Sequence, residues 1–308
     1  MPPTLGLSNW HLDPAKMNRA VFLLRPDQKP EDLYETGIQI IAAGECTALV
    51  DAMPSLTSAY NELSHRQTES GYQLRGGGHF IGLRDYFQFC KLLDRTIRSS
   101  DTGELTAPML VDCIARSFSG FRYEHMIKII WTPFYNNCKH LLAQTYDSPA
   151  ALADRTDVLD LIRGNLKDLP NDDFPGSRHL MVLSDHESAL QVLKDKGIIE
   201  MDKTTVLNGS HFPGDRSVLA TYSTINKVKN CMEAGHTVVL MHLDEIYESL
   251  YDMLNQQYTK GVGNGLFCRL AVGAHSRTCE VAPEFRCILI VDTGKNTRPM
   301  IKHVADIS

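Results

Sequence analysis

The sequence predicts an α/β protein in which a bundle of helices precedes a parallel sheet covered by helices on both faces. Two patterns support this prediction. From Pro30 to about Phe134, apolar residues recur at helical spacing, and the breaks between them hold Gly, Pro and polar residues. From Asp172 onward, short apolar runs alternate with helix-length stretches, which is typical of parallel strands joined by crossover helices.

The first half of the chain is expected to be helical after a short strand and turn at its start. Asp13-Pro14 would begin the first helix, because Asp is a favoured N-cap and Pro a favoured first helical residue. The Gly-rich stretch 67–80 is expected to be a surface loop. The later helices are expected to begin at Glu31 and Met53, to include the apolar stripe from Leu83 to Leu93, and to cover 106–118 and 123–131.

The second half is expected to hold the sheet. Its helices have clear end signals, because Ser184-Asp185 can cap a helix that runs to Lys196, and Gly235 follows a helix that begins at Ser217. A long helix is expected over 244–258. The expected strands are 179–183, a short one from Thr204, 237–241, 270–272 and 287–291.

Composition excludes several classes of protein. The net charge of -6 and a pI near 6.0 argue against a nucleic-acid partner. The eight Cys never fall at Cys-x-x-Cys spacing, and the 12 His never form a His-x-x-x-His pair, so we expect no bound metal. The N-terminus lacks the features of a signal peptide, and the apolar runs are too short for a transmembrane segment. We therefore expect a cytoplasmic protein with reduced thiols.

Four segments carry a resemblance to a known family. They are Ser8-Asn-Trp-His-Leu-Asp-Pro-Ala-Lys-Met-Asn-Arg19, Phe80-Ile-Gly-Leu-Arg-Asp-Tyr86, Asn171-Asp-Asp-Phe-Pro-Gly-Ser-Arg178 and Glu248-Ser-Leu-Tyr-Asp-Met-Leu-Asn-Gln256. These motifs are long, and together they resemble the mysterin family of giant AAA+ ATPases that are also RING-type E3 ubiquitin-protein ligases. The likeness runs from about residue 5 to about residue 292.

The resemblance implies a fold of AAA+ type, with the helical lid bundle of one unit followed by the parallel α/β sheet domain of the next. Residues 1–27 would be the sensor and arginine-finger end of a truncated AAA+ large domain, and 28–145 the helical lid. Residues 146–308 would be a second AAA+ large domain that lacks a phosphate loop and has an incomplete C-terminal end. The sequence 292–308 departs from the family pattern.

Three polar residues resemble parts of an AAA+ nucleotide site. Asn9 resembles the first sensor, Arg19 the arginine finger that stabilises charge on a transferring phosphoryl group, and Arg84 the second sensor in the lid. Each has a simpler alternative. Asn9 can be an Asn in a turn before a helix, Arg19 a surface Arg on a short helix, and Arg84 part of an Arg-Asp pair with Asp85 that caps a helix.

Asp244 and Glu245, after an apolar strand, resemble a Walker B motif that holds Mg²⁺ and orients water. His242 interrupts the apolar run, and two acids also suit the first turn of a helix. No Gly-x-x-x-x-Gly-Lys-Ser/Thr loop occurs in the 308 residues. The stretch after the first strand, 184–188, has neither Gly nor Lys, and Asp185 and Glu187 would repel a triphosphate.

The resemblance therefore implies a segment that contributes a lid, sensor and finger to ATP sites of a larger ring, while its own second unit does not hydrolyse ATP. ATP and Mg²⁺ would be cofactors of the parent protein, with none bound by this segment alone. Neighbouring AAA+ units of the same polypeptide would be its partners, and the parent would engage the ubiquitin-conjugating machinery. Two alternatives stay open, a stand-alone non-catalytic adaptor that binds proteins and an active ATPase with a non-standard phosphate cradle around Ser184. Whether the segment is itself an enzyme also stays open.

Overall fold

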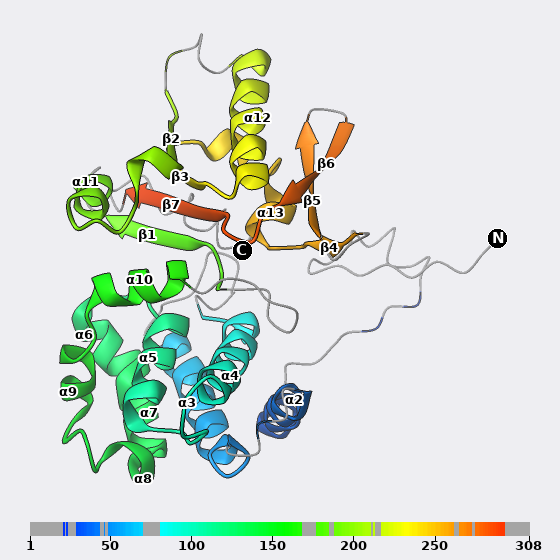
Figure 1. Cartoon of the computed structure of the whole chain (residues 1–308). Helices are drawn as coiled ribbons and strands as arrows, with labels where there is room; N and C mark the ends of the chain where they lie inside the picture. The colour runs from blue at the N-terminus through cyan, green and yellow to red at the C-terminus, as the bar shows by residue number, and fades with distance from the viewer. Residues whose placement is uncertain are drawn as a thin grey trace.

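The protein is described by a computed structural model, in which a bundle of helices is followed by a parallel sheet (Figure 1). The fold class expected from the sequence is thereby confirmed. Asn9 and Arg19 lie outside the described part of the chain. The structure describes residues 21, 23, 29–43, 46, 49–69, 81–167, 177–184, 188–210, 212, 217–261, 265–272 and 275–292.

The helical bundle surrounds one core of large aromatic side chains. Trp131, Tyr86, Phe89, Phe118 and Phe134 are fully buried in it, and the rings of Phe118 and Phe134 stack with centroids 5.5 Å apart. Aromatic pairs of this kind add to the free energy gained by burying their apolar area. The bundle consists of α2 (Pro30–Ala43), α3 (Met53–Glu69), α4 (Leu83–Arg98), α5 (Ala107–Ser117), α6 (Tyr123–Met126), η2 (Ile127–Trp131), α7 (Thr132–Asn137), α8 (Lys139–Leu142) and α9 (Pro149–Asp154).

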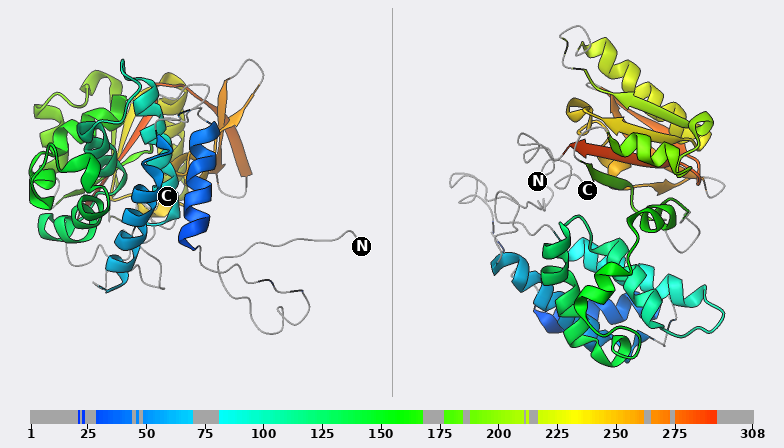
Figure 2. Two further views of the ribbon diagram at one scale, coloured as in Figure 1. Left: turned by 90° about the horizontal axis from the view of Figure 1, so that it is seen from below. Right: turned by 90° about the vertical axis from the view of Figure 1, so that its left-hand side faces the viewer.

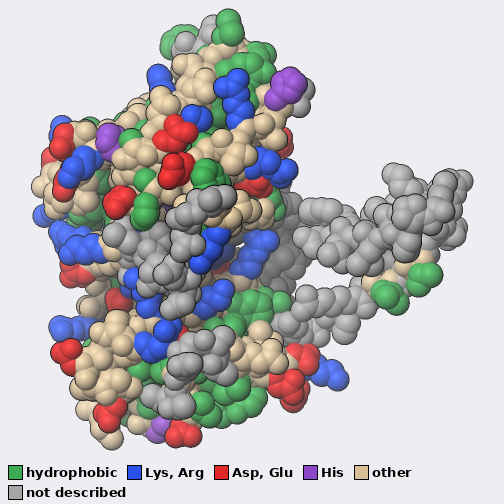
Figure 3. Space-filling model, turned by 45° about the vertical axis from the view of Figure 1, so that its right-hand side comes forward, with side chains coloured by type: hydrophobic (Ala, Val, Ile, Leu, Met, Phe, Trp, Pro, Cys, Tyr) green, Lys and Arg blue, Asp and Glu red, His purple; other side chains and the backbone are tan. Residues whose placement is uncertain are grey.

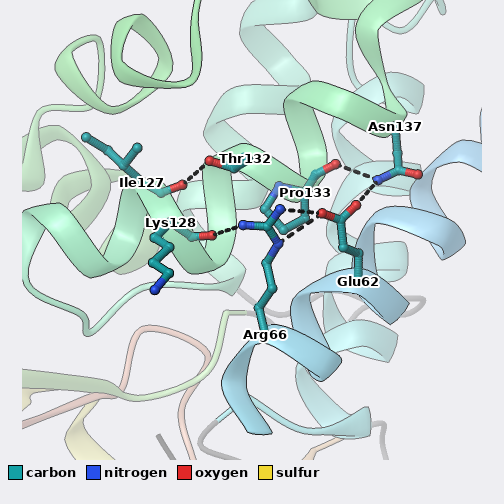
Figure 4. A network of polar contacts seen from close by, with 7 residues as sticks. All are labelled: Glu62, Arg66, Ile127, Lys128, Thr132, Pro133 and Asn137. Atoms are coloured by element: carbon teal, nitrogen blue, oxygen red, sulfur yellow. Dashed lines mark hydrogen bonds and ion pairs between the residues drawn. The ribbon is translucent and has the colours of Figure 1, made fainter. Parts of the chain in front are cut away.

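A π-helical turn, η2, interrupts the helix that begins with α6, and Pro133 explains it. Proline has no N–H, and in an α-helix its ring collides with the carbonyl four residues earlier, so the helix widens into a π-turn. In a π-turn each amide bonds to the carbonyl five residues earlier, as Thr132 does with Ile127. The Lys128 carbonyl therefore lacks a helical donor, because the residue five positions later is Pro133. Arg66 replaces that donor, because its Nη1 lies 3.0 Å from the Lys128 oxygen (Figure 4). Glu62 holds Arg66 through bonds of 2.9 and 2.7 Å and accepts a bond of 2.7 Å from Asn137. A side chain of α3 thus stabilises the widened turn.

Four parallel strands form the main sheet in the order β1-β7-β3-β2. Alternate residues of β3 and β7 point to opposite faces, so Val239 and Ile288 join one apolar core while Val238 and Leu289 join the other. Helices α10 and α11 cover the first face and α12 the second (Figures 1 and 2). The strands and helices are β1 (Leu180–Ser184), β2 (Thr204–Asn208), β3 (Thr237–Met241), β7 (Arg286–Asp292), α10 (Val158–Lys167), α11 (Ser188–Asp195) and α12 (Val218–Ala234), with the short turn η3 (Met201–Lys203) before β2.

The bundle and the sheet meet on α10. Leu161 packs against the bundle core, whereas Ile162 lies in the core of the sheet. The bundle core extends past residue 145, because α9 adds the buried residues Leu152 and Ala153 to it. The division of the chain at residue 145 stays a prediction.

The expected long helix over 244–258 is wrong. The chain instead forms a short 3₁₀ turn, η5 (Asp244–Ile246), one helical turn, α13 (Tyr251–Leu254), and the strand β4 (Thr259–Lys260). Left-handed backbone at His242 and Gln256, with φ of 52° and 51°, bends the chain at both ends of this stretch. These bends let Tyr247, Leu250 and Met253 cover the sheet, so their helical spacing reflects burial rather than one continuous helix.

A second, antiparallel sheet in the order β4-β5-β6 packs beside α12 and α13 (Figure 1). Its main part is a hairpin of β5 (Leu266–Val272) and β6 (His275–Val281). Strand β6 was not expected from the sequence, because five of its seven residues are exposed and it carries only two buried side chains. In the described part of the chain, no helix is long and apolar enough to cross a membrane.

Candidate functional site

The carboxyl edge of the parallel sheet is where an α/β fold of this kind binds ligands. At this edge β2 ends at Asn208 opposite Met241, the last residue of β3, and β1 ends at Ser184 opposite Asp292. Asp244 and Glu245 follow β3, so the structure brings these two acids to the same edge as Ser184. The edge is therefore the first candidate site.

Asp244 and Glu245 do not lie on the strand itself. Two residues, His242 and Leu243, separate Asp244 from the end of β3, the chain bends at His242, and both acids are exposed on the turn η5. Close packing of two strand ends accompanies this bend. The amide of Gly209 donates a 2.7 Å bond to the Met241 carbonyl, and a Cβ placed on Gly209 would lie 1.7 Å from the His242 oxygen. The backbone after β2 thus lies directly against the backbone after β3.

The connection between β1 and α11 is too short for a phosphate loop. Strand β1 ends at Ser184 and α11 begins at Ser188, which leaves three residues, 185–187, between them. The Gly-x-x-x-x-Gly-Lys-Ser/Thr loop needs eight residues between strand and helix. Asp185 and Glu187 lie outside the described residues, and the two flanking hydroxyls are 3.5 Å apart. Ser184 and Ser188, the described residues that flank this connection, supply neither the Gly nor the Lys of a phosphate loop.

The lid residues Arg84 and Asp85 lie at the opposite edge of the sheet. Arg84 Nη1 donates a 3.2 Å bond to Oδ1 of Asn255, just after α13. Asp85 caps its own helix, because the amide of Gly82 donates to its Oδ2 at 2.7 Å, and its Oδ1 pairs with Arg178 Nη1 at 2.5 Å. Asp85 therefore has the capping role that the sequence offered as the alternative, while Arg84 contacts another element.

Arg84 and the acidic pair are not brought together. Arg178, the partner of Asp85, lies two residues before β1, and Gln256 donates a 3.0 Å bond to the carbonyl of the neighbouring Ser177. Ser184 lies six positions after Arg178 along this extended segment, a path of about 20 Å. The lid end that carries Arg84 thus packs at the amino edge of the sheet, away from Asp244 and Glu245.

A polar joint connects the bundle to the sheet at this amino edge. Arg116 Nη2 donates a 2.9 Å bond to Ser177 Oγ, and Asn165 Nδ2 donates a 3.2 Å bond to the Arg178 carbonyl. Lys and Arg side chains gather along this junction on the face shown in Figure 3. A cavity of about 60 Å³ lies within the joint, with Asp85, Gln88, Arg116, Ser117, Asn165, Ser177 and Arg178 among its lining residues.

Sequence reasoning missed the residues of the joint, although part of the signal was present. Ser177, Arg178 and Asn255 occur in two of the motifs that resemble the mysterin family, but nothing in the sequence pairs them with the lid. No motif or spacing in the sequence identified Arg116 as a residue of the joint. Among the residues that the structure describes, no three His, Cys, Asp or Glu side chains gather as metal ligands.

His179 lies beside the joint, between the starts of β1 and β7. The backbone N–H of Cys287 donates to its Nδ1 at 3.3 Å, and its Nε2 lies 3.1 Å from the hydroxyl of Tyr258. An imidazole that accepts at Nδ1 is neutral, and Nε2 then carries the proton. Burial, with a smaller contribution from the charge of Arg286, lowers the pKa of His179 to about 4.

Comparison with known proteins matches both halves of the chain. Residues 38–130 match the family model described as the Midasin AAA lid domain, and residues 170–301 match that of the RNF213 AAA domain. The E3 ubiquitin-protein ligase RNF213 of Mus musculus is 31% identical over 294 residues and 93% of this chain, and that of Homo sapiens is 31% identical over 300 residues and 93%. The E3 ubiquitin-protein ligase rnf213-beta of Danio rerio is 29% identical over 297 residues and 94%. This chain spans only 5% of the length of each relative.

A helical lid followed by a parallel α/β domain, each matched by an AAA model, defines the chain as a segment of AAA type. RNF213 belongs to the mysterin family, which is the family that the four sequence motifs resemble. The chain belongs to the mysterin family and corresponds to an internal AAA segment of these relatives.

Proposed function

We propose that this segment forms part of the ATPase ring of a mysterin-like E3 ubiquitin ligase, in which it supplies a lid to one nucleotide site and an α/β unit that does not hydrolyse ATP. The proposal that the α/β unit does not hydrolyse ATP is supported by the three-residue connection between β1 and α11. Without a Gly-rich loop and its Lys, the backbone amides and the cation that cradle a triphosphate are missing. The exposed position of Asp244 and Glu245 supports the same proposal.

The lid would serve a site other than that of the sheet that follows it. This proposal is supported by Arg84, which lies near Arg178 and Asn255 at the amino edge, about 20 Å along the strand from the carboxyl edge. In this proposal Asn9 and Arg19 act at the site that the lid covers, as sensor and arginine finger. The neighbouring AAA units of the same polypeptide would supply the rest of that site, including ATP and Mg²⁺.

Ubiquitin transfer is proposed for the parent protein and not for this segment. The relatives are named as E3 ubiquitin-protein ligases, but the chain spans 5% of their length. Within such a ligase, in the cytoplasm, a silent AAA unit would transmit movements between active neighbours without consuming ATP.

Nucleotide binding and turnover by the purified 308-residue chain test the silent unit. We expect no Mg²⁺-dependent binding of a fluorescent ATP analogue and no ATP hydrolysis, and Glu245→Gln should leave both unchanged. Glu248→Gln, which alters an exposed acid outside the acidic pair, is the matched control. Magnesium-dependent turnover that Glu245→Gln abolishes and Glu248→Gln preserves would refute the proposal.

Binding to a neighbouring unit tests the ring against the alternative of a stand-alone adaptor. The segment of human RNF213 that precedes the matched region should bind this chain in analytical ultracentrifugation, because a lid needs the large domain it covers. A chain that stays monomeric with that segment would favour the adaptor.

A further inference from the structure

Two cysteines of the β5–β6 hairpin lie directly opposite each other. In the antiparallel register, Cys268 of β5 pairs with Cys279 of β6. Residues paired in this way have Cα atoms about 4.5 to 5.5 Å apart, and their side chains share one face of the sheet. A disulfide requires a Cα separation of about 4.4 to 6.8 Å. The hairpin therefore meets the backbone requirement for a disulfide without moving.

Both thiols point into the core beneath the hairpin. Cys268 is 1% exposed and Cys279 3% exposed, and Cys279 Sγ lies 3.6 Å from the Cys268 carbonyl oxygen and 3.9 Å from Met232 Sδ of α12. The Sγ of Cys268 lies 3.7 Å from the carbonyl oxygen of Arg269. Each thiol hydrogen is thus directed at a backbone carbonyl, and rotation about the Cα–Cβ bonds is needed to bring the two sulfurs together.

Burial opposes reaction while the hairpin is closed. It raises the pKa of Cys268 to about 12 and that of Cys279 to about 11, and only a thiolate attacks an oxidant readily. Strand β6, however, lies at the end of the order β4-β5-β6, and His275, Ser276, Arg277, Thr278 and Glu280 on it are exposed. A terminal strand with only two buried side chains opens locally at low cost in free energy. Local opening of β6 exposes both thiols together.

We propose that Cys268 and Cys279 form a redox-responsive pair, which hydrogen peroxide oxidises to a cross-strand disulfide that locks β6 to β5. In the first step one thiolate attacks the peroxide, the O–O bond breaks, and a sulfenic acid forms with loss of one water after protonation. In the second step the other thiol attacks that sulfur, the S–S bond forms, and a second water leaves. The two thiols supply the two electrons that reduce the peroxide.

The consequence would be a change in the mobility of the hairpin. The carbonyl of Ser249, before α13, accepts a 3.1 Å bond from the amide of Ala271 in β5, and the carbonyl of Met232 accepts a 2.9 Å bond from Ala282 just after β6. These bonds join the hairpin to α12 and to the chain that leads to Asn255, the partner of Arg84. A locked hairpin would stiffen the side of the sheet against which the lid packs.

Thiol labelling of the full 308-residue chain tests the proposal. The protein is treated with hydrogen peroxide, alkylated under denaturing conditions, digested and analysed by mass spectrometry. We expect the eight labels of the reduced chain to fall to six, with one linked peptide pair that contains Cys268 and Cys279 and that dithiothreitol releases. Amide exchange of β6 should slow in the oxidised protein.

Two variants separate this pair from the other cysteines. Cys268→Ala should abolish the linked peptides, whereas Cys231→Ala, which alters another buried cysteine of the same core, should preserve them. Circular dichroism confirms that each variant is folded. Eight labels after peroxide treatment of the folded protein, or a mixture of links among all cysteines, would overturn the proposal.

Discussion

Arg178 and Asp85 form an ion pair of 2.5 Å that joins the chain two residues before β1 to the first turn of α4. The same carboxylate accepts the amide of Gly82 through its other oxygen at 2.7 Å. One side chain therefore both begins a lid helix and attaches the lid to the sheet. The other contacts of the joint, from Arg116 to Ser177 and from Asn165 to the Arg178 carbonyl, are also hydrogen bonds, and they add to the apolar packing of Leu161 against the bundle core.

Asp85→Ala should destabilise the protein by about 1 to 2 kcal/mol, because it removes a helix cap and an ion pair together. Arg178→Met should cost less, about 0.5 to 1 kcal/mol, since the cap remains. Urea unfolding at low and high salt measures both. Asp160→Ala, at the exposed pair with Arg163, is the control and should change stability by less than about 0.5 kcal/mol. A double-mutant cycle without coupling between Asp85 and Arg178 would contradict the assignment.

Arg66→Met should destabilise the bundle by about 1 to 2 kcal/mol, because the Lys128 carbonyl loses its donor and Glu62 its cation. Arg66→Lys should recover little of this, since an ammonium cannot reproduce the planar fork of a guanidinium. Lys128→Met is the matched control. Lys128 contributes its backbone oxygen, so this exposed side chain should be replaceable within about 0.5 kcal/mol. Equal effects of Arg66→Met and Lys128→Met in thermal unfolding would argue against the role of Arg66.

Stability should fall as the pH drops from 6.5 towards 4, because of His179. The folded state holds the pKa of this imidazole at about 4, below its ordinary value of 6.5. Between these values the unfolded chain binds a proton that the folded chain does not, and the loss reaches at most about 3 kcal/mol. His179→Asn, which does not titrate, should show a smaller pH dependence in urea unfolding over this range. The same slope for both proteins would show that other groups are responsible.

Gly209→Ala should cost more than about 2 kcal/mol, because the new Cβ would lie 1.7 Å from the backbone oxygen of His242. The strand ends after β2 and β3 would have to separate. Gly82→Ala is a suitable control, since a Cβ at that position meets nothing within 4 Å. Calorimetry of both variants compares them directly, and a Gly209→Ala protein as stable as Gly82→Ala would show that the two strand ends adapt easily.

Local signals predicted the regular elements well. Ser217 caps α12 by accepting the Ala220 amide, and Gly235 ends that helix with φ of 70°, as the sequence indicated. The apolar runs at β3 and β7 became buried parallel strands, because such runs are stable only when both faces are covered, whereas β1 at the end of the strand order is half-buried. In contrast, helical spacing over 244–258 was misleading, since burial against a sheet can impose the same spacing on a bent chain.

In the candidate site, too, some features could be predicted from the sequence and others could not. The short, acidic stretch after Leu183 and the absence of a phosphate loop were visible in the sequence, because both depend on residue identity alone. The roles of Asn9 and Arg19 stay predictions. Asp85 pairs with Arg178, which lies 93 positions away in the sequence, and Arg84 pairs with Asn255, which lies 171 positions away. Local sequence patterns cannot predict contacts between residues so far apart in the chain.

The sequence by itself thus determined the order of bundle and sheet and the absence of the phosphate-binding motif, since composition, periodicity and capping act over a few residues. Only the tertiary structure decided that the lid meets the amino edge of the following sheet, that Arg66 supports the turn at Pro133, and that Cys268 faces Cys279. The physical reason is that strand register and side-chain contacts between distant elements depend on how the cores pack together.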